Sequence, residues 1–323
     1  SAASDVYKRQ MDIIAKISEE LGIRKNQAEA AVKLIDEGNT IPFIARYRKE
    51  ATGALNDEVL RNLYERLTYL RNLEERKETV LAGIEEQGKL TEELRAQILA
   101  AETQVAVDDL YRPYRPKRRT RATIAKEKGL EPLANLILLQ KMTETPLEEA
   151  KNYINPEKEV STAEDALNGA KDILAESVSD NADFRTHIRE LTMKHGQLLS
   201  AAKDPEAESV YEMYYEFSES LSKLAGHRIL AISRGEKEKF LTVKIDAPVD
   251  RILSYLDRKL ITAPSAPTAA VLHEVTEDAY NRLIAPAIER EIRSDLFEKA
   301  EDGAIRVFAV SYTHLTLPTI CSV

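Results

Sequence analysis

The sequence predicts an all-α fold, an elongated scaffold of many helices with a helix-turn-helix-like part and one β-hairpin. Apolar residues recur at intervals of three and four over most of the 323 residues, which is the period of a helix with one buried face. Residues that cap helices precede these runs, and glycine or proline follows many of them. Only the segment 228–245 departs from this period, so a single hairpin is expected there.

Three short helices are expected near the N-terminus. The first has one apolar face and is closed by Gly22. The second opens with the capping-box pair Asn26 and Glu29 and ends at Gly38, and the third begins at Pro42. Three short helices with glycine turns are compatible with a helix-turn-helix, whose third helix would here be basic.

That third helix has two interpretations. As a DNA-reading helix it would use its cations, Arg46, Arg48 and Lys49. As part of a compact bundle it would pack through its apolar side chains, Phe43, Ile44 and Tyr47. The pattern favours packing, because any compact helical bundle has short helices of this kind.

A long helix is expected over residues 56–87, with Asn56 as its cap. Its leucines follow 3–4 spacing, which favours the core seam of a bundle, although the same stripe would suit a coiled-coil partner. Thr91 and Thr103 are placed to cap the next two helices. The second of these leads into a basic stretch.

Five further helices are expected between residues 131 and 226. Pro146 takes the first position of one helix, Ser161 and Glu164 form a capping box at the start of another, and Pro205 opens the last. This last helix carries an aromatic group that we expect in the core: Tyr211, Tyr214, Tyr215 and Phe217.

The hairpin is expected from two runs rich in β-branched and apolar residues, 228–233 and 239–245. Two strands are only marginally stable alone, so the hairpin must lie against helices. Beyond it we expect a short helix and then a long one from Thr268, broken or kinked at Pro286.

The stretch from residue 108 to residue 138 is basic in an acidic chain. Within seventeen residues it carries eight cations: Arg112, Arg115, Lys117, Arg118, Arg119, Arg121, Lys126 and Lys128. Pro113 and Pro116 are expected to hold the residues before them extended. Tyr111 and Tyr114 lie among the cations, with flat faces able to stack on a base.

Two interpretations of this basic stretch remain open. An extended arm of arginine and tyrosine can run along the phosphate backbone of RNA or DNA. Alternatively, the arginines pair with carboxylates elsewhere and the tyrosines fill the core, because charge runs are usually solvated faces. Exposed, aligned guanidinium groups would favour binding, and carboxylate-paired groups would favour a structural role.

The composition limits the possible functions. The chain has 46 Lys and Arg against 55 Asp and Glu, a net charge of -9, which argues against a protein that coats nucleic acid with its whole surface. No segment approaches the ~18 apolar residues of a membrane span, so we expect a cytoplasmic protein with no membrane partner. Cys321 is the only cysteine, which excludes an intrachain disulfide.

No motif in the sequence indicates catalysis. His273 and Glu274 lack the second histidine of the zinc motif H-E-x-x-H, because position 277 is Glu277. Phosphate-binding loops, dinucleotide-binding motifs and nucleophile elbows are absent too. We therefore expect no enzymatic activity, no metal site and no cofactor.

Residues 1–10 and 311–323 look like translated sequencing adapters, so we exclude them from the fold. The remainder is expected to divide into three parts. These are a helical domain at 11–110, a basic arm with a helical domain at 111–226, and the hairpin with the long helix at 227–310.

Two long motifs carry a resemblance to a known family. IPFIARYRKEATGALNDE (residues 41–58) and DLYRPYRPKRRTRATIAKEKGLEPLA (residues 109–134) resemble signatures of the bacterial Tex family of transcription accessory proteins. The eukaryotic relative of that family is a transcription-elongation factor that also chaperones histones. The similarity runs from Met11 to about Ala309.

This resemblance implies the N-terminal helical region of an RNA- or DNA-binding transcription accessory protein. In the family, an RNase-H-like domain, a helix-hairpin-helix part and an RNA-binding OB-fold domain follow, and we expect none of them within these residues. Nucleic-acid binding is credited largely to the last of these. The alternative is therefore a scaffold that positions the missing C-terminal domains or docks the transcription machinery.

Overall fold

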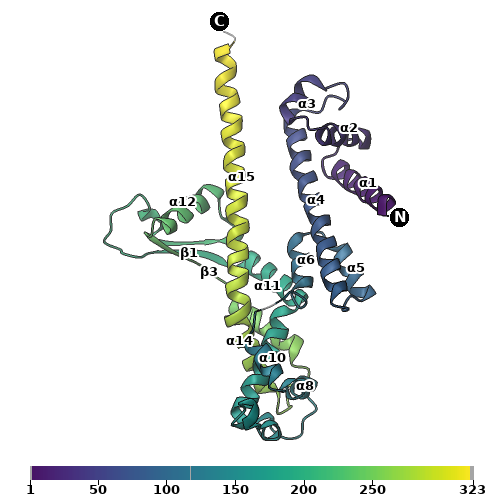
Figure 1. The fold of residues 1–323 in the computed structure, drawn as a ribbon. Coiled ribbons are helices and arrows are strands. Elements are labelled where there is room, and N and C mark those ends of the chain that lie inside the picture. The colour runs from purple at the N-terminus through teal and green to yellow at the C-terminus, as the bar shows by residue number, and fades with distance from the viewer. Residues whose placement is uncertain (1, 117, 321–323) are drawn as a thin grey trace. The chain divides into compact units, whose positions relative to one another are not determined.

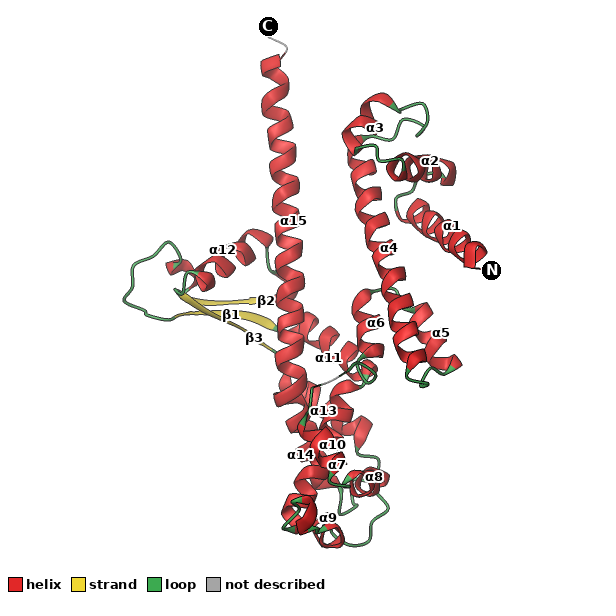
Figure 2. Ribbon diagram, viewed as in Figure 1, coloured by secondary structure: helices red, strands yellow, loops and turns green. Residues whose placement is uncertain are grey.

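The computed structural model describes residues 2–116 and 118–320, with side chains from Gln10 to Val307 apart from Lys117. Helices dominate these residues (Figure 2), which confirms the predicted mainly α class. The chain divides into two compact units, Ser1–Tyr114 and Arg115–Val323. Each unit has a hydrophobic core of its own.

The first unit is built around the long helix α4. Its helices are α1 (Ala2–Glu20), α2 (Lys25–Asp36), α3 (Ile41–Tyr47), α4 (Asp57–Glu86), α5 (Glu92–Ala100) and α6 (Gln104–Tyr111). Helix α4 buries a stripe of side chains at 3–4 spacing: Leu60, Leu63, Leu67, Leu70, Leu73, Val80 and Ile84. The other five helices contact α4, so the stripe is the predicted bundle seam.

The starts of three helices in this unit follow local side-chain chemistry. Asn56 accepts a hydrogen bond of 2.8 Å from the backbone N–H of Val59 at the start of α4. Thr91 and Thr103 cap α5 and α6 in the same way. These three predicted caps are confirmed.

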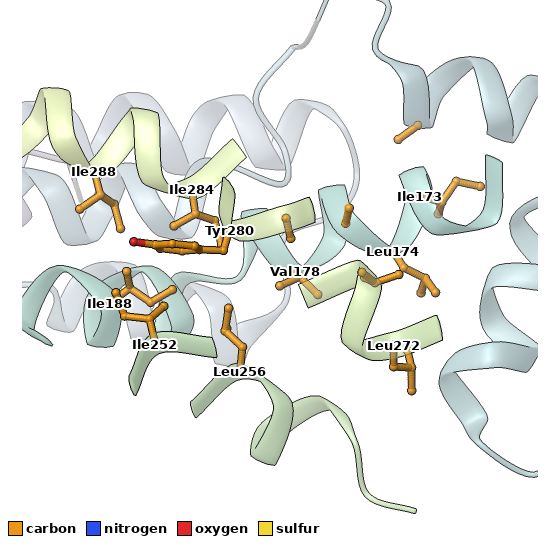
Figure 3. Close-up of a cluster of buried hydrophobic side chains, with 14 of the residues drawn as sticks. Ile173, Leu174, Val178, Ile188, Ile252, Leu256, Leu272, Tyr280, Ile284 and Ile288 are labelled. Carbon is orange, nitrogen blue, oxygen red and sulfur yellow. The ribbon is translucent and has the colours of Figure 1, made fainter. Parts of the chain in front are cut away.

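The second unit packs most of its helices around α10. Its helices are α7 (Arg121–Glu127), α8 (Glu131–Leu139), α9 (Pro146–Ala150), α10 (Ala163–Asp180), α11 (Ala182–His195), α12 (Gly226–Lys237), α13 (Val249–Leu260), α14 (Ala269–Asp278) and α15 (Ala285–Ile320). Four short 3-10 helices connect them: Lys151–Tyr153, Pro156–Lys158, Glu212–Tyr214 and Leu221–Lys223. Figure 3 shows buried side chains from several of these elements meeting α10: Ile173, Leu174, Val178, Ile188, Leu256 and Leu272.

Two predicted capping boxes are displaced by one or two residues. Helix α2 begins after Arg24 rather than after Asn26. Helix α10 begins after Thr162 rather than after Ser161, and Asp165 closes the box. In both cases a polar residue within two positions of the expected cap takes its place.

The strands in the described residues form one antiparallel sheet. Its strands are β1 (Gln197–Ala202), β2 (Glu216–Ser220) and β3 (Leu241–Asp246), in the order β2-β1-β3. The central strand β1 pairs Leu199 with Ser218 on one side and with Lys244 on the other. Helix α12 lies beside the sheet (Figure 1) and contacts both β3 and α15.

The hairpin predicted at 228–245 is wrong in its first half. Residues 228–233 belong to α12, and only β3 lies where a strand was expected. Ile229 and Ile232 are three residues apart and both buried, so helical spacing outweighs their β-branching. The central strand gave no signal in the sequence, because residues 197–202 include no β-branched side chain.

The helix predicted from Pro205 is also wrong. The segment forms a loop, a short 3-10 helix and then β2. Its aromatic group is nevertheless at the core, as expected. Tyr211 and Tyr214 are buried, and Tyr215 and Phe217 pack against the same core.

The outer edge of β3 faces α15. The backbone N–H of Ile245 donates a hydrogen bond of 3.1 Å to the Glu289 carboxylate. The Arg293 guanidinium donates one of 3.5 Å to the carbonyl of Val243. Side chains of α15 therefore satisfy backbone groups on this edge of the sheet.

The break expected at Pro286 takes the form of a π-helix, Ala279–Ile284, between α14 and α15. Proline lacks an N–H, and its ring collides with the carbonyl four residues earlier in a regular helix. A wider π-helical turn directly before Pro286 accommodates both effects.

Candidate nucleic-acid interface

The basic stretch begins in a turn and not in an extended arm. Helix α6 ends at Tyr111, and Arg112 keeps helical dihedral angles (φ -52°, ψ -43°). The backbone N–H of Tyr114 then donates a hydrogen bond of 2.9 Å to the carbonyl of Tyr111. The prediction that Pro113 holds the preceding residue extended is therefore wrong, because the end of α6 fixes Arg112 instead.

Tyr111 and Tyr114 lie half-buried against the core of the first unit. The Arg76 guanidinium lies 5.7 Å from the centre of the Tyr111 ring. The Gln87 side chain donates a hydrogen bond of 2.9 Å to the carbonyl of Tyr114. This bond links the turn to the end of α4. Packing accounts for much of both rings, and stacking on a base stays a prediction.

Three arginines follow in the non-helical segment before α7: Arg115, Arg118 and Arg119, all exposed. Among the described residues, neither Arg115 nor Arg118 has an ion-pair partner. Arg119 lies 2.8 Å from Glu127, with side chains 69% and 53% exposed, and so exposed a pair contributes only about 0–1 kcal/mol. Lys117, another predicted contact, lies outside the described residues.

Thr120 ends this segment by capping α7, since its hydroxyl accepts a hydrogen bond of 3.1 Å from the backbone N–H of Thr123. Helix α7 then packs against α10, with Ala122 and Ala125 buried. The exposed segment is thus attached directly to the core of the second unit.

The cations on and after α7 lie next to carboxylates. Burial raises the pKa of Asp172, and the positive charges of Arg282 and Arg121 oppose that rise. Lys126 lies 3.6 Å from Glu131. Arg121 thus interacts electrostatically with Asp172, and Lys126 forms a partly exposed ion pair with Glu131.

Lys128 is the most firmly held of these cations. Its ammonium group donates a hydrogen bond of 3.0 Å to the backbone carbonyl of Glu159 and lies 3.5 Å from the carboxylate of the same residue. Its side chain is only 26% exposed. Among the described cations of this stretch, Arg115 and Arg118 thus lack an ion-pair partner, whereas Arg119, Lys126 and Lys128 each have one.

The cations at the end of α3 and just after it are all exposed: Arg46, Arg48 and Lys49. None has an ion-pair partner among the described residues. The packing role expected for Ile44 is confirmed, since it is fully buried. For Tyr47 the packing expectation is wrong, because its side chain is 64% exposed, and Phe43 is 37% exposed.

Other kinds of site find little support in the described residues. These contain no cluster of three or more His, Cys, Asp or Glu that would hold a metal ion. They also include no helix both long and apolar enough to cross a membrane. A cavity of about 490 Å³ lies among α1, α4 and α5, where the Lys77 ammonium is already bonded to Glu74 and to the carbonyl of Leu99.

Two family models match the chain. Residues 11–85 match the Tex-like protein N-terminal domain, and residues 141–308 match the Tex central region-like model. The second match covers more than half of the 323 residues. The basic segment between Arg115 and Lys128 lies between the two matched regions.

The chain is also similar to longer curated proteins. It is 43% identical to Protein tex of Bordetella pertussis, over 94% of this chain and 40% of that protein. Transcriptional accessory protein Tex of Neisseria gonorrhoeae is 38% identical, with coverages of 95% and 41%. The human S1 RNA-binding domain-containing protein 1 is 30% identical, with coverages of 98% and 33%.

The chain thus spans about two fifths of the bacterial relatives and a third of the human one. Both motifs that carried the resemblance lie within the aligned helical region. With the two matched models, these similarities establish that the chain belongs to the Tex family.

Proposed function

We propose that this chain is the N-terminal helical part of a transcription accessory protein, and that residues 115–119 contact phosphates of RNA or DNA. One observation carries the proposal. In a chain with a net charge of -9, Arg115 and Arg118 are exposed and lack an ion-pair partner among the described residues. The names of two relatives, a transcriptional accessory protein and an S1 RNA-binding domain-containing protein, fit such a ligand.

The chemistry of this segment suits phosphate. A guanidinium group is always charged and offers two parallel N–H donors to an oxyanion. Arg119 adds a third group, because its exposed pair with Glu127 exchanges easily for a phosphate. Contacts of this kind position a strand without reading its sequence. We therefore expect binding with little sequence preference and a strong dependence on salt.

The test is fluorescence-anisotropy binding of the chain to single-stranded RNA and to duplex DNA across a salt series. The double variant Arg115→Ala/Arg118→Ala should bind more weakly, and its salt slope should fall by roughly one per contact removed. The control is Arg61→Ala/Arg95→Ala, which removes the same charge from ion-paired arginines of the first unit and should bind like the wild type.

Equal affinity of both variants and the wild type would refute the proposal. It would then leave the second candidate, a scaffold without a nucleic-acid surface in this region. The observation that favours the scaffold is the pairing of Lys126 and Lys128 with Glu131 and Glu159. In that case the segment positions the further domains of the longer protein or docks the transcription machinery.

Either role is non-enzymatic and needs no cofactor, and we place the protein in the cytoplasm beside the transcription machinery. The sequence offers no catalytic motif on which an enzymatic proposal could rest. A secondary phosphate contact through Arg46, Arg48 and Lys49, at the end of the helix-turn-helix-like part, belongs to the same proposal.

A further inference from the structure

Helix α3 presents an exposed aromatic face. The rings of Phe43 and Tyr47, one helical turn apart, lie 5.3 Å apart at 45° to each other. They are 37% and 64% exposed. Large apolar side chains on a short helix normally turn toward the core, yet in α3 only Ile44 is buried. The exposure of the Tyr47 ring therefore has no packing explanation within the first unit.

The backbone beneath this face is held firmly. Ile44 is fully buried and fixes the orientation of α3. After the helix, the buried Thr52 bonds back to the carbonyl of Arg48, through its backbone N–H at 3.1 Å and its hydroxyl at 3.2 Å. The side chain of Gln27 on α2 donates to the carbonyls of Thr52 and Gly53.

One of these links depends on a glycine. Gly53 has a φ of +62°, and a Cβ atom there would lie 2.7 Å from the Gln27 amide nitrogen. Glycine takes this backbone conformation with little strain, and a side chain at this position would force the Gln27 amide to move. The aromatic face thus stands on a fixed support, so a ligand would meet it without a large ordering cost.

One cation contacts the Phe43 ring, and two more lie close to the rings in the sequence. Arg48 lies over Phe43, with its guanidinium carbon 5.6 Å from the ring centre. Arg46 and Lys49 are exposed beside it, and Glu50 is the one acidic residue in the same stretch, 41–50. Cations without ion-pair partners next to exposed rings match a ligand that carries both negative charge and flat apolar surfaces.

We propose that the outer face of α3 is a stacking platform for single-stranded nucleic acid. A base stacks on Tyr47, while Arg46, Arg48 and Lys49 neutralise the phosphates on either side. The strand must be unpaired, because in a duplex the flat faces of the bases are already covered by their neighbours. The ligand class rests on the proposed function, but the residues differ from the arginines at 115–119.

Tyr47→Trp tests the platform directly. The chain contains no tryptophan, so this variant has one indole, at the proposed site. We expect its emission to be quenched by single-stranded oligo(U) or oligo(dT) at low salt. An abasic strand of equal charge and a blunt duplex should leave it nearly unchanged. Tyr64→Trp, on α4 and 47% exposed, is the matched control and should respond to none of them.

Affinity gives a second readout. Tyr47→Ala removes an exposed ring, so the helical circular-dichroism signal should persist. Single-strand binding should weaken about 5- to 100-fold, the range for loss of one base–aromatic stack. If the face made phosphate contacts alone, Tyr47→Ala would change the affinity for abasic and for ordinary strands by the same factor. Oligo(U) and oligo(dT) report whether the platform distinguishes RNA from DNA.

The two proposals fail in different ways. If Arg115→Ala/Arg118→Ala weakens binding while saturating oligonucleotide still quenches the indole of Tyr47→Trp, both stand. If the double variant binds like the wild type and quenching persists, only the platform stands. A bound strand that leaves the indole emission unchanged, together with unaltered affinity of Tyr47→Ala, overturns the platform and leaves the face to a protein partner.

Discussion

Replacing Glu291 with alanine should destabilise the second unit by about 3 kcal/mol. Glu291 on α15 lies 2.6 Å from Arg185 and 2.8 Å from Arg189, both on α11. The Arg185 side chain is fully buried and that of Glu291 is 35% exposed. Removing one partner of a buried ion pair costs about 3–5 kcal/mol, because the remaining charge stays in the interior. The partial exposure of Glu291 places the expected loss at the lower end.

Hydrogen exchange of the backbone amides in α11 and α15 is the suitable assay, since it reports on this unit alone. A loss of about 3 kcal/mol corresponds to roughly 100-fold faster exchange of the amides protected by unfolding of the unit. The matched control is Glu274→Ala, which breaks the ion pair of Glu274 with Lys171 between α14 and α10. Those side chains are 58% and 25% exposed, so the control should lose less than about 1 kcal/mol.

Equal effects of the two substitutions would refute the reasoning, because Glu291 meets a fully buried arginine and a second arginine, whereas Glu274 meets one partly exposed lysine. Arg189→Ala is an internal check. Its side chain is 20% exposed, and Arg185 would keep its 2.6 Å contact with Glu291. Its loss should therefore be clearly smaller than that of Glu291→Ala.

Two further predictions concern the first unit. Asn56→Ala removes the cap of α4 and should cost about 1 kcal/mol in urea unfolding followed by circular dichroism; Asn62→Ala, inside the same helix, should cost less, and the reverse order would contradict the capping argument. The hydrogen bond from Arg66, together with its charge, lowers the pKa of Glu20 below its usual 4.5. The ionised carboxylate therefore stabilises the folded state above pH 4.5, and this contribution is lost as pH falls through the lowered folded-state pKa. Glu20→Gln should then be less stable than the wild type at pH 7, by less than about 1 kcal/mol, with the difference vanishing in acid; a constant difference would argue against the titration.

Helices with strong local signals could be predicted from the sequence. The caps at Asn56, Thr91 and Thr103 each need only one side chain and the backbone three residues on. The sheet could not be predicted so well. Its central strand pairs with partners on both sides through backbone atoms, and residues 197–202 carry little strand propensity of their own. There the tertiary environment decides the structure.

For the candidate site, the sequence locates the cations but cannot say which are already paired. Lys128 and Arg118 look alike in the sequence, yet only Lys128 meets a carboxylate from a distant segment, Glu159. Likewise, nothing in the spacing of α3 distinguishes the buried Ile44 from the exposed Tyr47. A helix of seven residues has too few positions for its periodicity to predict which apolar side chain is buried.

The way α15 covers the sheet affects how molecules of this protein meet one another in concentrated solution. An open strand edge is a template on which a strand from another molecule can add. On β3, the Glu289 carboxylate accepts a hydrogen bond from the N–H of Ile245, and on β2 the exposed acidic side chain of Glu216 repels an identical strand. The small sheet is thereby protected against edge-to-edge aggregation on both sides, by a helix on one and by charge on the other.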